Sequence, residues 1–108
     1  MSDSPKASSK VELYFEDSAA LITIRASGLI TMGRGRFGII ILTAAAANAN
    51  IDVYDGVDSS GDLLFSLDAL ANYSQVIDFH YSVKFQRGIY VVVTGANAAV
   101  TVTYIPTF

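Results

Sequence analysis

The chain contains no cysteine, no tryptophan, one histidine and two prolines among its 108 residues. Without cysteine it can form neither disulfides nor thiolate metal sites. Its cysteine content therefore does not indicate whether the protein works in an oxidising or a reducing compartment. Charged residues make up only 16% of the sequence, against about 25% in an ordinary soluble domain. Hydrophobic residues make up 52%. This balance favours a subunit that assembles with others, because interface cores are poor in charge and rich in aromatic residues.

Long apolar runs are also missing. The longest, at residues 37–47, is well short of the roughly 20 residues that cross a bilayer, and the polar first ten residues do not resemble a signal peptide. We therefore expect no membrane partner. The net charge of −3 argues against a nucleic-acid partner, since nucleic-acid-binding domains are usually basic. The length predicts a single domain at 11–108, preceded by a flexible arm at 1–10.

Short runs of β-branched and aromatic residues alternate with turn residues, and no stretch has helical periodicity. Strands are expected at 11–15, 21–26, 29–32, 37–43, 51–54, 63–67 and 75–81, followed by a terminal pair at 89–94 and 100–104. This pattern predicts an all-β fold: an antiparallel β-sandwich, jelly-roll-like, with about eight short strands.

The terminal pair has the strongest β signal, and the tight turn at 95–98 predicts that it forms a hairpin. Alternation directs Ile89, Val91 and Val93 toward the core and Tyr90 and Val92 away from it. That second side is too apolar for water, so we expect a second layer or a second subunit to cover it. The residues expected at a subunit interface are Phe37, Ile39, Ile41, Tyr90, Val92 and Tyr104.

Acidic residues cluster between two of the expected strands, where Asp55, Asp58 and Asp62 are weak candidates for calcium binding. Their spacing does not match an EF-hand loop. Asp and Gly are also common turn residues. We therefore expect turn chemistry here, with no metal and no cofactor.

Two other motifs resemble catalytic or nucleotide-binding features. His80 shares one side of an alternating strand with Asp78, opposite Phe79 and Tyr81, but no activated nucleophile accompanies it. The glycine- and arginine-rich segment at 33–38 precedes a strand, whereas a phosphate-binding loop opens a helix. We expect no catalytic residues and no enzymatic activity.

Three further features lie along residues 30–104: a glycine-bearing turn before a long apolar strand at 33–42, an Asp-Val-Tyr-Asp-Gly strand end at 52–56, and closing strands at 87–91 and 100–104. In these features the chain resembles small virion structural proteins of tailed bacteriophages. The resemblance implies a β-sandwich that decorates capsids or is associated with the head or tail. It further implies a homo-oligomer, with a trimer favoured, that contacts the major capsid protein or other virion proteins. Such a protein is made in the host cytoplasm and located in the virion.

The aromatic composition, with six Tyr and six Phe, leaves a second function open. Tyrosines aligned on one sheet face can stack against sugars, although packing in cores and interfaces is their commoner use. The alternative function is therefore a carbohydrate-binding or host-adhesion β-sandwich module.

Overall fold

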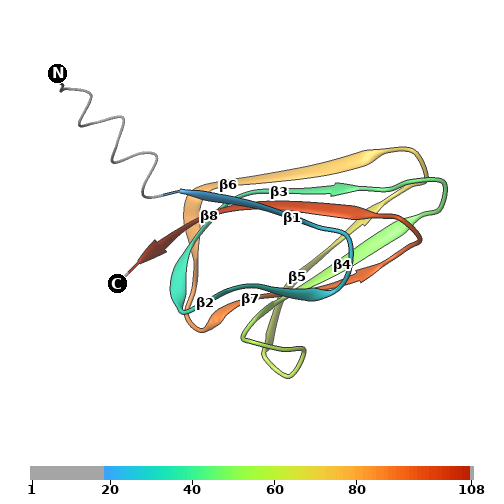
Figure 1. Cartoon of the computed structure of the whole chain (residues 1–108). Helices are drawn as coiled ribbons and strands as arrows, with labels where there is room; N and C mark the ends of the chain where they lie inside the picture. Colours follow the sequence, from blue (N-terminus) through green and yellow to red (C-terminus); the bar gives the residue numbers. More distant parts are fainter. Residues whose placement is uncertain (1–18, 108) are drawn as a thin grey trace, which may run out of the picture.

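The computed structural model describes residues 19–107, and all regular structure in this range is β-strand (Figure 1). The strands are β1 (Ala20–Ile24), β2 (Gly28–Met32), β3 (Arg34–Thr43), β4 (Ala49–Asp55), β5 (Asp62–Ala69), β6 (Ser74–Phe85), β7 (Gly88–Thr94) and β8 (Ala99–Thr107). No helix that could cross a membrane occurs within residues 19–107. The expected arm at 1–10 and the expected strand at 11–15 lie outside the described residues.

The strands form two four-stranded antiparallel sheets. The first sheet has the order β1-β8-β3-β6 and the second the order β2-β7-β4-β5. The pairs β4–β5, β3–β6, β2–β7 and β1–β8 are nested, as if one long hairpin had been rolled up. This nesting is the strand order of a jelly roll. The expected all-β sandwich of about eight strands is confirmed.

The expected terminal hairpin is wrong, because β7 and β8 belong to different sheets. β7 lies between β2 and β4, whereas β8 lies between β1 and β3. The intervening turn therefore crosses from one sheet to the other. Gly95 in this turn has φ +120°, and a Cβ there would lie 2.7 Å from the carbonyl oxygen of Asn48. The alternation itself is confirmed, since Ile89 and Val91 are fully buried and face the core.

The core fills the space between the inner faces of the two sheets. Its largest side chains form an aromatic cluster around Phe37, whose ring centroid lies 5.0 Å from that of Phe85 and 6.0 Å from those of Phe65 and Phe79. Phe65 comes from the second sheet and the other three from the first, so the cluster joins the two layers. Tilted and edge-to-face pairs of this kind contribute about 0.5–1.5 kcal/mol beyond the burial of their area.

A bulge interrupts β6 at His80 and Tyr81, whose φ values are +52° and +58°. The pairing register between β3 and β6 shifts at the same level, between Phe37 and Ile39. The Asp78 carboxylate accepts a hydrogen bond from the His80 amide at 2.8 Å. This local bond helps to hold a backbone conformation that non-glycine residues rarely adopt.

The bulge turns Tyr81 to the outer face of the first sheet, whereas strict alternation predicts that it shares the inner side with Phe79. The Tyr81 ring lies over Gly38: a Cβ on Gly38 would come within 2.5 Å of the ring and 2.4 Å of the Thr103 hydroxyl. That hydroxyl also accepts a hydrogen bond from the Ile39 amide at 2.8 Å. Only glycine therefore fits at position 38 without moving its neighbours.

Gly38→Ala is expected to lower the free energy of unfolding by about 1–3 kcal/mol, because the added methyl group must displace Tyr81 or Thr103. Gly28→Ala is the matched control, since a Cβ there meets no atom within 4 Å and should leave stability unchanged or slightly raised. Urea denaturation of both variants checks this prediction. Equal losses in the two variants would contradict it.

Candidate functional site

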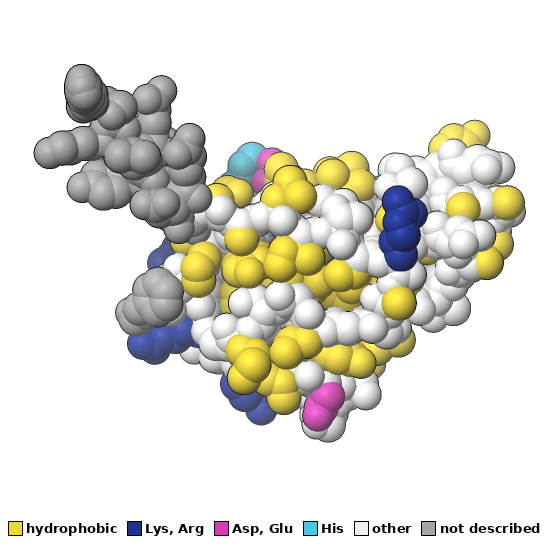
Figure 2. Space-filling view, in the orientation of Figure 1, with side chains coloured by type: hydrophobic (Ala, Val, Ile, Leu, Met, Phe, Trp, Pro, Cys, Tyr) yellow, Lys and Arg dark blue, Asp and Glu magenta, His cyan; other side chains and the backbone are white. Residues whose placement is uncertain are grey.

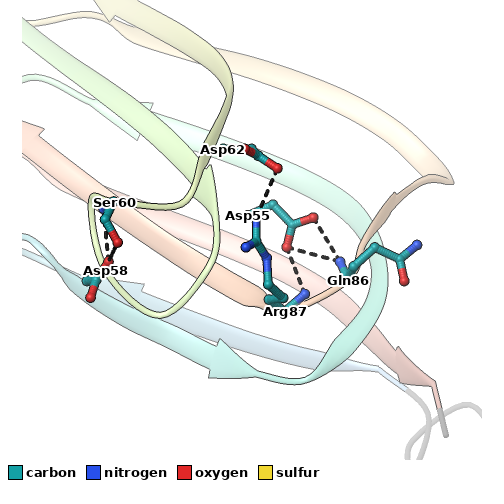
Figure 3. Close-up of polar contacts among 6 residues, drawn as sticks. All are labelled: Asp55, Asp58, Ser60, Asp62, Gln86 and Arg87. Atoms are coloured by element: carbon teal, nitrogen blue, oxygen red, sulfur yellow. Dashed lines mark hydrogen bonds and ion pairs between the residues drawn. The ribbon is translucent and has the colours of Figure 1, made fainter.

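Asp55 at the end of β4 is the one buried charged side chain among the described residues, with 8% of its surface exposed. Figure 3 shows its carboxylate directed at the turn between β6 and β7. The Gln86 amide donates to both carboxylate oxygens at 3.0 Å, and the Arg87 amide donates to Oδ1 at 2.8 Å. Asp55 thus fixes the β6–β7 turn against β4, which is a structural role.

The other two carboxylates of the calcium candidate have separate partners (Figure 3). Asp58 accepts hydrogen bonds from the hydroxyl and the amide of Ser60, which hold the pKa of its carboxyl below the ordinary value. Asp62 accepts a 2.9 Å hydrogen bond from Arg87 in an exposed ion pair. Within residues 19–107 no group of three His, Cys, Asp or Glu side chains could hold a metal ion. Asp55, Asp58 and Asp62 therefore do not converge on a calcium site.

His80 lies at the bulge of β6 with 83% of its side chain exposed. Its Nδ1 is 3.6 Å from the Asp78 carboxylate. The nearby Ser82 hydroxyl donates to the Phe79 carbonyl, and that of Ser74 donates to the Thr43 hydroxyl. Neither serine is thus paired with His80, and the arrangement lacks the nucleophile–base contact of a hydrolase.

Two of the six expected interface residues lie in the core instead. Phe37 is fully buried within the aromatic cluster, and Tyr104 is 8% exposed with its ring packed edge-on against Phe85. The expectation that they contact a partner is therefore corrected. Both residues face the interior of the sandwich and are buried by other residues of the same chain.

The other four expected residues lie on opposite sides of the sandwich. Ile39 and Ile41 face outward from β3 in the first sheet and are half-buried. Tyr90 and Val92 face outward from β7 in the second sheet and are also half-buried. The structure therefore places these residues on two separate outer faces.

The outer face of the second sheet carries a row of apolar side chains that crosses all four strands. Leu29 of β2 pairs with Tyr90 of β7, Tyr90 pairs with Tyr54 of β4, and Tyr54 pairs with Leu63 of β5. The two tyrosines are half-buried, while Leu29 and Leu63 are 41% and 56% exposed. At the usual spacing between strands this row, the Tyr54–Tyr90 row, spans about 14 Å.

Sequence reasoning identified Tyr90 but missed Leu29, Tyr54 and Leu63. The alternation at 51–54 already separates Tyr54 from Ile51 and Val53, which are fully buried. It does not reveal that Tyr54 and Tyr90 are cross-strand neighbours, because that depends on the sheet order.

Comparison with protein-family models and with curated proteins finds no match for this chain. The jelly-roll fold and the Tyr54–Tyr90 row are therefore the observations that bear most directly on function.

Asp55→Ala is expected to lower the free energy of unfolding by about 1–3 kcal/mol, because it leaves the part-buried amides of Gln86 and Arg87 without their acceptor. Asp62→Ala removes only an exposed ion pair and should change stability little. Thermal and urea denaturation check both variants. A loss in Asp62→Ala that matches the loss in Asp55→Ala would contradict the structural role of Asp55.

Proposed function

We propose that this protein is a structural subunit of a virus particle of the tailed-bacteriophage kind, with a non-catalytic role that depends on association of its copies. It acts as a capsid decoration or as a head- or tail-associated protein, located in the virion after synthesis in the host cytoplasm. The observation that carries the proposal is the Tyr54–Tyr90 row, an aromatic and aliphatic strip on the outside of a jelly roll.

The composition of the outer faces supports association. Tyrosine is enriched at protein interfaces and charge is depleted in their cores. Figure 2, which looks at the side of the sandwich along β1 and β2, shows hydrophobic side chains spread over that side with only a few charged groups among them. On the first sheet, Ile41 lies between Thr101 of β8 and Val76 of β6, so its cross-strand neighbours are uncharged. The cross-strand partner of Ile39 on β6 is Asp78, so this outer face carries one carboxylate beside its apolar residues.

The expected oligomer constrains how the Tyr54–Tyr90 row is used. If the row meets its own copy, the contact is isologous and closes at a dimer. A trimer or larger ring needs a heterologous contact, in which the row of one subunit meets a different surface of the next. We propose the second arrangement, with the major capsid protein or another virion protein as a further partner.

A second candidate function is carbohydrate binding. Tyr54 and Tyr90 are adjacent on one sheet face and keep part of their rings accessible. Asp52 lies on the same face beside Val92, and its carboxylate accepts a hydrogen bond from the Ser66 hydroxyl. Aromatic faces beside a carboxylate provide both the stacking surface and the hydrogen-bond acceptor that a sugar requires.

Analytical ultracentrifugation of the full chain is expected to show an oligomer of three or more copies at micromolar concentration. The double variant Tyr54→Ser/Tyr90→Ser should dissociate, because truncating an interface hot spot typically costs about 2 kcal/mol or more. Leu70→Ser is the matched control, since it removes a 66% exposed apolar side chain outside the row. A wild-type monomer would overturn the proposal, as would an oligomer that the double variant leaves intact.

Glycan-array binding distinguishes the second candidate function, carbohydrate binding, from subunit association. If the face binds sugar, Tyr54→Ala or Tyr90→Ala should each abolish the array signal while oligomeric mass stays at the wild-type value. Loss of both readouts together would instead assign the row to subunit contact. Absence of any array signal from the wild-type protein would remove the carbohydrate-binding candidate.

A further inference from the structure

Basic side chains gather on the first sheet at the end nearest the C-terminus. Arg34 and Arg36 are two residues apart on β3 and both exposed, so they extend from the same face of the sheet. Lys84 of β6 is the direct cross-strand partner of Arg36. These are three of the five Lys and Arg residues that follow residue 10. Figure 2 shows Lys and Arg side chains at this end of the molecule.

This arrangement is electrostatically unfavourable by itself. Like charges directly opposite each other on paired strands destabilise a sheet. Within residues 19–107, the ion pairs are His80–Asp78 and Arg87–Asp62, and neither includes Arg34, Arg36 or Lys84. The described part of the chain thus concentrates three positive charges with no carboxylate against them.

The three cations line a concavity of about 330 Å³, together with Gln86 and Thr107. Gln86 offers an amide group and Thr107 a hydroxyl, and no acidic residue contributes to the lining. The cavity is at the small end of the range for small-molecule sites, which is about 300–1,000 Å³. Its walls therefore present hydrogen-bond donors and positive charge to a ligand of a few heavy atoms.

We propose that this concavity binds a tetrahedral oxyanion, the phosphate or sulfate group of a small molecule. A guanidinium group matches the oxygens of such an anion with two parallel hydrogen bonds, and a lysine adds a compact point charge. Bound between Arg36 and Lys84, the anion offsets the repulsion across the two strands, while Arg34 and Thr107 donate from the other side. The proposal does not depend on the proposed function, because the concavity lies on the first sheet and the Tyr54–Tyr90 row on the second.

Titration of the isotope-labelled full chain with sodium phosphate, at ionic strength kept constant with sodium chloride, tests the site. Saturable NMR shifts are expected at the amides of Arg34, Arg36 and Lys84, with affinity in the millimolar range. Arg36→Gln and Lys84→Gln should each weaken binding by about tenfold, as loss of a charge-assisted contact predicts. Arg25→Gln is the matched control, because this exposed arginine lies outside the concavity and its loss should leave binding unchanged.

Parallel titrations with glycerol 1-phosphate and with a sulfated monosaccharide distinguish phosphate esters, sulfate esters and the free anion as the preferred source. Shifts that do not saturate, or that move equally at Arg25 and Arg87, would overturn the site in favour of general ionic effects. Equal affinity in the wild type and Arg36→Gln would also overturn it.

Discussion

The contact between the two inner sheet faces is the constraint on which the rest of the structure depends. Each sheet alone would expose one apolar face, and the Phe37 cluster fills the space where they meet. Phe65 is the only member of this cluster from the second sheet, so its contacts with Phe37 and Phe79 tie the layers together. Phe37 and Tyr104, which the sequence suggests as interface residues, therefore pack between the two sheets instead.

The same packing explains the irregular part of β6. This strand contributes both Phe79 and Phe85 to the core, yet the bulge between them turns Tyr81 outward. Gly38 then provides the space in which the Tyr81 ring lies, and Thr103 bonds the Ile39 amide beside it. The conformational cost of the left-handed backbone at His80 and Tyr81 is thus offset by contacts on both faces of the first sheet.

Much of the fold could be predicted from the sequence because alternation reports which side a strand residue faces. The inward orientation of Ile89 and Val91 and the all-β sandwich follow from it. Alternation does not report which strand lies opposite, so β7 and β8 looked like a hairpin although they pair in separate sheets. Alternation also places Phe37 on the same side of its strand as Ile39 and Ile41, but the register shift between Phe37 and Ile39 breaks the alternation and leaves Phe37 in the core. The Tyr54–Tyr90 row depends on the sheet order, so alternation alone does not predict it.

The bulge at His80 and Tyr81 also restricts how copies can associate. β6 is an edge strand of the first sheet, and an unpaired edge invites another strand to add to it. Two consecutive residues at positive φ break the regular row of amides and carbonyls that such pairing needs. Edge addition along the whole of β6 is therefore blocked. In the proposed association, the Tyr54–Tyr90 row on the outer face of the second sheet offers the aromatic contact area that this bulged edge does not.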